Sequence, residues 1–158
     1  MSKHRVLAFL LALLVMLIDQ ATKQWALQAM DFIDVQTLLP VLDVRLAMNH
    51  GVAFSLLTQY GMQTPWVFIA FTSMLSVMIV VMIIKSTPIE RIDAYCYGLI
   101  LGGALGNLID RLRFGAVIDF IDVHIGRHHW PVFNFADSFI CLGALLLIIY
   151  SLKQGRHS

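Results

Sequence analysis

The stretch VFIAFTSMLSVMIVVMII, at residues 67–84, contains no charged side chain. A helix needs about 20 apolar residues to cross the hydrocarbon core of a bilayer, so this stretch predicts a membrane-spanning helix. The whole chain has the same character, because 59% of its 158 residues are hydrophobic and 13% are charged. Soluble domains usually contain about 25% charged residues. We therefore expect an integral membrane protein with a single domain, residues 1–158.

Three further apolar runs lie on either side of this stretch. Together the four runs predict membrane helices at about residues 6–28, 66–85, 94–112 and 135–153. The first run resembles a secretory signal peptide, but it continues in helical character to Ala29, and no clear A-x-A cleavage site follows its apolar core. We interpret it as a retained helix.

Basic residues near the ends of these helices indicate their orientation. If the helices alternate in direction, six basic residues share one side: Lys3, Arg5, Lys85, Arg91, Lys153 and Arg156. Three others, Arg45, Arg113 and Arg127, fall on the opposite side, so the bias is moderate. Because cytoplasmic loops are enriched in Lys and Arg, we expect both termini in the cytoplasm.

The two longer connections would lie on the opposite, outer side of the membrane. Residues 42–46 alternate apolar and charged side chains like a half-buried strand, residues 49–51 are a turn signal, and residues 52–57 suggest a return strand. We therefore expect a small β-sheet within about residues 36–58. Residues 120–130 mix apolar and basic side chains and predict a short helix at the membrane interface. The expected fold is an all-α membrane bundle of four helices with these two additions.

Three aspartates on three different predicted helices reach a similar depth. At about 1.5 Å per residue, Asp19, Asp110 and Asp137 lie about 21, 25 and 24 Å from the cytoplasmic ends of their helices. Asp119 follows Asp110 by nine residues and leaves the membrane on the same side. A carboxylate beside a bilayer is energetically costly, so this convergence indicates a site.

Some members of this layer also have a simpler interpretation. Asp19 and Lys23 have i, i+4 spacing with the acid first, which predicts a structural ion pair. Asn134 and Asp137 resemble a helix capping box, with Asp in place of the usual Glu. From depth alone, Asp110 is as good a catalytic candidate as any other acid in the layer.

Other groupings give no sign of a cofactor. His128 and His129 lack a third metal ligand at a suitable spacing. The pair Gly102 and Gly106 follows no strand, so it predicts close helix packing rather than a phosphate-binding loop. The net charge of +1 gives no indication of nucleic-acid binding.

Two aspartates on the same side suggest a shared chemical task. Two carboxyl groups a few ångströms apart share one proton, so one can activate water while the other donates a proton. A pair formed by Asp119 and Asp137 would therefore support peptide hydrolysis, with asparagine amides or backbone N–H groups stabilising the oxyanion. Two rival classes are a proton-coupled transporter or channel subunit and a transferase that binds Mg²⁺ through several Asp. The first predicts acids spread across the membrane, and the second predicts a multi-Asp helix motif.

Five ordered blocks of the chain resemble the lipoprotein signal peptidases, also called signal peptidase II. The blocks are DQATK at 19–23, NHGVAF at 49–54, GGALGNLIDR at 102–111, VIDF at 117–120 and FNFAD at 133–137. Each block is weak alone, but their order within a four-helix chain of this size is highly specific. The resemblance covers nearly the whole chain.

This resemblance implies an aspartic-type endopeptidase of the bacterial inner membrane. The enzyme would cut prolipoproteins just before a lipobox cysteine that already carries diacylglycerol, at an active site toward the periplasm. The resemblance implies Asp119 and Asp137 as the catalytic pair, and Asp19 with Lys23 as the ion pair that holds the first helix. It also implies a set of supporting residues: Asn49, Gly51, Gly103, Asn107, Asp110, Arg111, Asn134 and Ala136.

The resemblance also implies partners. They are diacylglyceryl-prolipoprotein substrates, membrane lipids and inhibitors of the globomycin type, which are cyclic lipopeptides that occupy the active site. We expect no metal or other cofactor, no nucleic acid and a monomeric protein.

Overall fold

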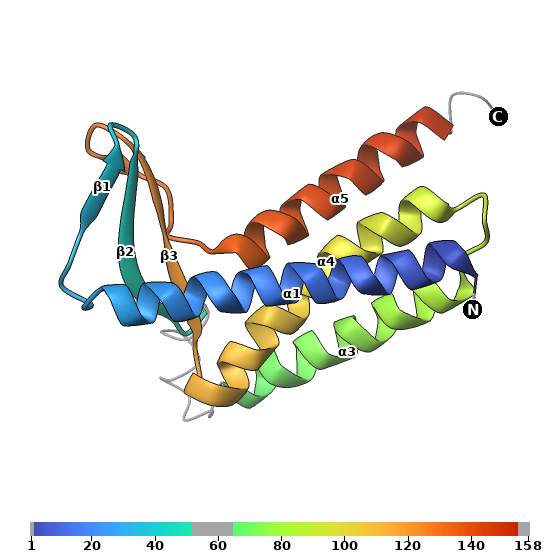
Figure 1. Ribbon diagram of the computed structural model, residues 1–158, viewed down its shortest axis with the longest axis horizontal. Coiled ribbons are helices and arrows are strands. Elements are labelled where there is room, and N and C mark those ends of the chain that lie inside the picture. Colours follow the sequence, from blue (N-terminus) through green and yellow to red (C-terminus); the bar gives the residue numbers. More distant parts are fainter. Residues whose placement is uncertain (1, 52–64, 155–158) are drawn as a thin grey trace.

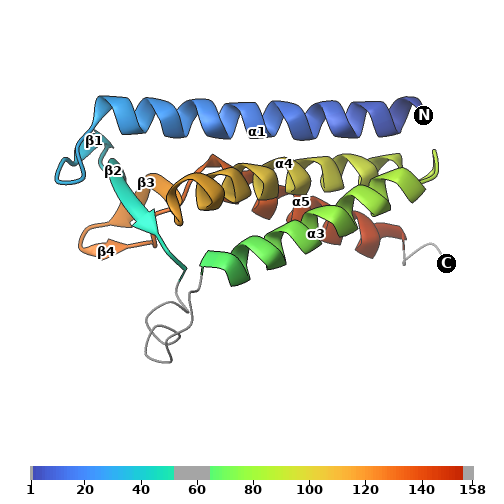
Figure 2. The ribbon, with the colours of Figure 1, turned by 90° about the horizontal axis from the view of Figure 1, so that it is seen from below.

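The computed structural model describes residues 2–51 and 65–154. Four of the helices in this part are long and apolar enough to cross a membrane, which confirms the predicted bundle. They are α1 (Lys3–Ala29), α3 (Pro65–Lys85), α4 (Arg91–Phe114) and α5 (Phe135–Gln154). Figures 1 and 2 show that α1 begins and α5 ends at the same end of the bundle.

A small antiparallel sheet covers the other end of the bundle (Figure 1). Its strands pair in the order β1 (Gln36–Leu39), β2 (Leu42–Asn49), β3 (Val117–Ile125) and β4 (His128–His129). The predicted sheet is therefore present, but half of its strands come from the connection between α4 and α5. The predicted return strand at residues 52–57 lies outside the described residues.

The predicted interfacial helix at residues 120–130 is wrong, because most of this segment forms β3 and β4. Asp43 pairs with Asp122 and Ala47 pairs with Asp119 across β2 and β3. Residues 117–125 are rich in β-branched side chains, which fit a pleated sheet better than a helix. The edge of β2 also supplies the backbone partners that the segment needs.

One buried carboxylate links three strands of the sheet. The carboxylate of Asp122 is almost fully buried, and it contacts Arg45 Nε at 2.9 Å and His129 Nδ1 at 2.9 Å. These contacts connect β3 to β2 and β4. The sheet is therefore fixed by side chains as well as by its backbone ladder, and it gives β3 a defined position above the helices.

Helix α4 lies at the centre of the bundle and contacts the other three helices. The predicted close-packing face is confirmed, since a Cβ atom on Gly102 would lie 2.5 Å from the carbonyl oxygen of Ala12, and one on Gly106 would collide with the Asp19 carboxylate. Small residues at this spacing allow two helices to approach closely. As a result, polar groups on α1 reach polar groups on α4 directly.

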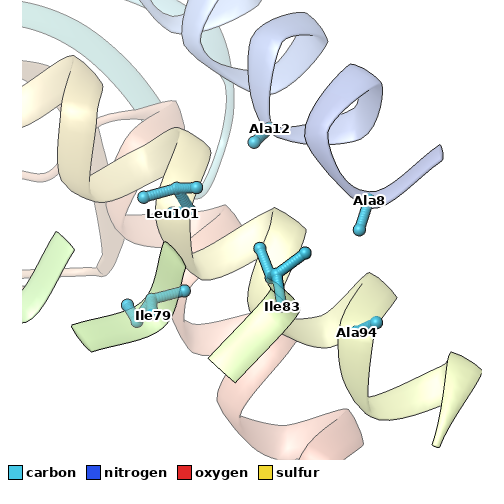
Figure 3. Close-up of a cluster of buried hydrophobic side chains, with 6 residues drawn as sticks. All are labelled: Ala8, Ala12, Ile79, Ile83, Ala94 and Leu101. Atoms are coloured by element: carbon cyan, nitrogen blue, oxygen red, sulfur yellow. The ribbon is translucent and has the colours of Figure 1, made fainter. Parts of the chain in front are cut away.

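The half of the bundle near the termini has an apolar core. Figure 3 shows six buried side chains from α1, α3 and α4 that form it: Ala8, Ala12, Ile79, Ile83, Ala94 and Leu101. The buried aspartates and Lys23 lie instead in the sheet or toward the end where the helices meet it.

Candidate active site

A layer of polar side chains lies at the junction between the helices and the sheet. Its members come from α1, α4, β3 and the segment that leads into α5. Six of them are buried almost completely: Asp19, Lys23, Asn107, Asp110, Asp119 and Asn134. Buried polar groups require hydrogen-bond partners, and in this layer they supply them to each other.

Lys23 is at the centre of one half of the layer. Its ammonium Nζ lies 2.8 Å from Asp19 Oδ2, 2.7 Å from Asp110 Oδ2 and 2.8 Å from Asn107 Oδ1. The predicted contact with Asp19 is present, and a second acid joins it. An ammonium has three N–H donors, so this lysine is fully satisfied.

The same two acids also accept hydrogen bonds from backbone groups. Asp19 Oδ1 accepts from the Ala136 N–H at 2.9 Å, and Asp110 Oδ2 accepts from the Ile118 N–H at 3.2 Å. Ala136 directly precedes Asp137, and Ile118 directly precedes Asp119. Asp19 and Asp110 therefore hold the chain at the residues just before the other two aspartates.

Gln20 completes this half of the layer. Its Nε2 donates to Asp110 Oδ1 at 2.9 Å and to the Gly106 carbonyl at 3.1 Å. Sequence reasoning did not assign this residue a role. Its position next to Asp19 was the only available signal, and it did not show which way the side chain points.

Asp119 occupies the other half of the layer and is held by two asparagines. Asn49 Nδ2 donates to Asp119 Oδ2 at 2.8 Å, and Asn134 Nδ2 donates to Asp119 Oδ1 at 2.6 Å. Burial raises the pKa of Asp119 to about 6, and the nearby Asp137 carboxylate also raises it, while the two asparagine hydrogen bonds oppose this change. Asp119 therefore retains its proton to a higher pH than an ordinary aspartate.

Asp137 lies in the first turn of α5 and contacts the same asparagine. Its Oδ2 accepts from the Asn134 N–H at 3.3 Å, and its own N–H donates to Asn134 Oδ1 at 2.9 Å. The predicted capping box is therefore formed in both directions. Its Oδ1 accepts from Asn107 Nδ2 at 2.8 Å. Asp137 is only half-buried and lines a cavity of about 210 Å³ next to Trp130 and Phe133.

Asn107 connects the two halves. Its Oδ1 accepts from Lys23 Nζ and from Asn134 Nδ2 at 3.2 Å, while its Nδ2 donates to Asp137. A single amide thus contacts the charged centre of one half and a carboxylate of the other. The asparagine amides of the layer donate to carboxylates, where sequence reasoning had suggested oxyanion stabilisation.

The remaining candidate residues border this layer. The Arg111 guanidinium lies over the Phe68 ring at 5.6 Å from its centroid, and Nη1 is 3.4 Å from the Asn107 carbonyl oxygen. Gly51 has a φ of 91°, and a Cβ atom there would lie 2.8 Å from the same phenyl ring. Gly103 faces the backbone of Ala136, so a side chain there would displace the start of α5.

Asp119 and Asp137 contact one shared side chain, and within the described residues neither forms an ion pair with a basic side chain. The charge of Asp137 raises the pKa of Asp119, so the two carboxyl groups interact electrostatically. The arrangement can therefore supply a general base and a general acid together. No cluster of three or more His, Cys, Asp or Glu side chains in the described part of the chain is arranged to hold a metal ion.

Comparison with known proteins identifies similar chains. The family model for Signal peptidase (SPase) II matches residues 11–153. The lipoprotein signal peptidase of Yersinia enterocolitica is 42% identical over 138 residues, which cover 87% of this chain and 82% of that protein. The lipoprotein signal peptidase of Francisella tularensis subsp. novicida is 42% identical over 153 residues, covering 95% and 94%. A solved bacterial membrane enzyme, determined by the in meso method, is similar with a TM-score of 0.83 and 32% identity, covering 96% of this chain and 90% of that one.

Proposed function

This chain belongs to the signal peptidase II family of aspartic-type peptidases, and we propose that it removes the signal peptide from diacylglyceryl-modified prolipoproteins. Its relatives in Yersinia and Francisella are named lipoprotein signal peptidases and are similar over most of their length. The cut would fall immediately before the lipidated cysteine.

One observation supports this function most strongly. Asp119 and Asp137 both bind Asn134, and no ion pair to either is present among the described residues. Neutral amide donors orient both carboxyl groups without fixing their charge. This environment suits a pair that must gain and lose a proton in each catalytic cycle.

The proposed reaction uses the single proton of this pair. The ionised carboxylate takes a proton from water while the water oxygen attacks the scissile carbonyl carbon. The protonated carboxyl group then supplies the proton that the leaving amine needs when the C–N bond breaks. The raised pKa of Asp119, about 6, favours this residue as the holder of the shared proton. Asp137, which borders the cavity beside Trp130, would then activate the water.

The supporting residues would hold the catalytic pair in position. Lys23 forms ion pairs with both Asp19 and Asp110, and these acids in turn bind the backbone next to each proposed catalytic residue. Asn49 and Asn107 orient Asp119 and Asp137, respectively. Gly51, Gly103, Arg111 and Ala136 would shape the surroundings of the pair.

The chain has four helices that can cross a membrane, in keeping with a multi-pass protein of the bacterial membrane. We further propose that it lies in the inner membrane as a monomer, with both termini in the cytoplasm. The end that carries the sheet would then face the periplasm. Substrates would arrive through the lipid phase, and inhibitors of the globomycin type would occupy the same site.

Substitution of each aspartate tests the proposal. Asp119→Asn and Asp137→Asn should each slow the cleavage of a purified diacylglyceryl prolipoprotein by at least about 100-fold, which is the lower end of the range for a general acid or base. Asp34→Asn, at an exposed position in the connection after α1, is the matched control and should keep full activity. A chelator should leave turnover of the unmodified enzyme unchanged. Full activity in either catalytic variant, if folded, would contradict the assignment.

A further inference from the structure

A second polar cavity lies at the opposite end of the bundle from the candidate active site. It has a volume of about 340 Å³ and opens between the end of α3 and the beginning of α4. Its lining combines three exposed apolar residues with charged and polar groups: Met78, Val81, Met82, Lys85, Ser86, Glu90, Asp93 and Tyr97. Small-molecule sites in proteins start at about 300 Å³, so the cavity is large enough for a small polar group.

The charges in this cavity are not paired with each other. In the described part of the chain, neither the Lys85 ammonium on α3 nor the Asp93 carboxylate on α4 makes a hydrogen bond or an ion pair. Glu90 uses Oε2 to accept from Thr87, which leaves its other carboxylate oxygen available. A half-buried carboxylate such as Asp93 is costly beside lipid without a cationic partner.

A cation from α1 also lies near the cavity and is engaged. Arg5 donates through Nε at 3.0 Å and through Nη2 at 2.7 Å to the Ser86 carbonyl oxygen, and thereby closes the end of α3. Among the described residues that line the cavity, Lys85 on α3 is the cation, and Glu90, just before α4, and Asp93 on α4 are the acids. A ligand that satisfies all three must carry an anion and a cation close together.

The apolar part of the lining indicates where such a ligand comes from. Met78, Val81 and Met82 continue from the charged mouth along the exposed face of α3, toward the middle of the span. Lys85 ends α3, and Asp93 lies in the first turn of α4, which is the level of lipid headgroups for helices that cross a membrane. Methionine side chains also adapt readily to flexible chains.

We propose that this cavity binds a phospholipid with a primary-amine headgroup, such as phosphatidylethanolamine. Lys85 binds the phosphate, and Asp93 and Glu90 accept hydrogen bonds from the ammonium group. One acyl chain lies along the three apolar residues of α3. An anionic headgroup without an amine leaves both acids unpaired, and a choline headgroup has no N–H to donate. This site does not depend on the proposed peptidase activity.

Lipid retention measures this binding directly. The purified protein is titrated in detergent with phosphatidylethanolamine, phosphatidylcholine or phosphatidylglycerol of identical acyl chains, and bound lipid is counted by native mass spectrometry. The unmodified protein should retain phosphatidylethanolamine roughly tenfold better than phosphatidylcholine, because a hydrogen bond to a charged group is worth about one factor of ten. Equal retention of the two lipids overturns the proposal.

Three variants locate the binding. Asp93→Asn should remove most of the preference for the primary amine, and Glu90→Gln, at an exposed position that tolerates change, should reduce it. Lys85→Gln should weaken the retention of all three lipids. Lys153→Gln is the matched control, since Lys153 lies on α5 and lines a different, mostly apolar groove. An unchanged preference in both acid variants overturns the proposal.

A basic peptide segment is the competing occupant. The positively charged start of a signal peptide would suit the two acids, but it would meet Lys85 as a like charge. If Asp93→Asn slows cleavage in proportion to the number of lysines at the start of the substrate, and lipid retention stays unchanged, the cavity binds substrate and the lipid proposal is overturned.

Discussion

Asp19 and Asp110 differ sharply from Asp119 and Asp137, although all four lie at the same end of the bundle. The first two contact the ammonium of Lys23 at 2.8 and 2.7 Å and also accept backbone N–H donors. The second two are held by the neutral amides of Asn49, Asn107 and Asn134. The partners of a carboxylate decide whether it serves as a fixed charge or as a proton carrier.

Removal of Lys23, the cation shared by Asp19 and Asp110, should have the largest effect on stability. Lys23→Met leaves two buried acids without a counter-ion, and breaking such a buried pair costs about 3–5 kcal/mol of unfolding free energy. We expect a large fall in the thermal unfolding midpoint in detergent, with activity lost along with the fold. Lys3→Met, at an exposed site, is the control and should change stability by less than about 0.5 kcal/mol.

The same variant can be rescued if this interpretation is correct. Adding Asp19→Asn and Asp110→Asn to the Lys23→Met background removes the unpaired charges and should restore part of the midpoint. A Lys23→Met protein as stable as the unmodified one would show that the two acids need no counter-ion.

Asn107 contacts both Lys23 and Asp137, so its loss should affect stability and catalysis together. Asn107→Ala removes an acceptor from Lys23 and a donor from Asp137, and each unsatisfied buried partner costs about 1–3 kcal/mol. We expect a lower unfolding midpoint and slower cleavage. Gln20→Ala removes the donor to Asp110 and to the Gly106 carbonyl but no contact to Asp119 or Asp137, so it should lower stability while the rate per folded molecule is retained. Equal rates in both variants would mean that Asn107 acts only on the Lys23 side.

Substitution of Gly51 tests how closely the surroundings of Asp119 and Asp137 are packed. Gly51→Ala forces a side chain into a left-handed conformation, at about 1–2 kcal/mol, and against the Phe68 ring that lies beneath Arg111. We expect a lower midpoint and reduced cleavage. Gly126→Ala has a φ of 60° but nothing within 4 Å of the new Cβ atom, so it should show only the backbone cost. Identical activities in the two variants would exclude a role for packing at Gly51.

The pH dependence should show the smallest but most specific effect. Because burial raises the pKa of Asp119 to about 6, the shared proton is lost and the cleavage rate falls as pH rises through this value. Asn49→Ala removes a hydrogen bond that lowers this pKa, so the descending limb should move to higher pH. If the descending limb of the pH–rate profile stays in place or moves to lower pH, the proposed effect of the Asn49 hydrogen bond on the pKa of Asp119 is wrong.

Stability provides an independent check on the same group. The folded state binds the Asp119 proton more tightly than an unfolded chain with a pKa of 3.8. The stability that this proton contributes is therefore complete below pH 3.8 and lost as pH rises through about 6. Asp119→Asn should lack this part of the pH dependence of the unfolding midpoint.

Much of this arrangement follows from local patterns in the sequence. The apolar runs predicted four spans, and the spacing of Asp19 with Lys23 and of Asn134 with Asp137 predicted contacts within one turn. Counting residues along the helices also brought Asp110 and Asp119 to one end. These features depend on neighbours within a few residues, so the period of a helix is enough to predict them.

Features that depend on distant partners could not be predicted from the residues alone. β3 forms because β2, about 75 residues earlier, presents a free edge. Asp110 differs from Asp119 because its carboxylate contacts a lysine, whereas the carboxylate of Asp119 contacts asparagines. The depth of an aspartate along a helix does not predict which of these partners it contacts. The direction of the Gln20 side chain depends on α4 in the same way.

The position of Asp137 on α5, after β3 in the chain, also has a consequence for biosynthesis. Its proposed partner, Asp119, lies on β3 and therefore leaves the ribosome before α5 does. A nascent chain thus holds one carboxyl group of the pair and not the other. The proposed proteolytic competence would therefore arise only after α5 has joined the bundle.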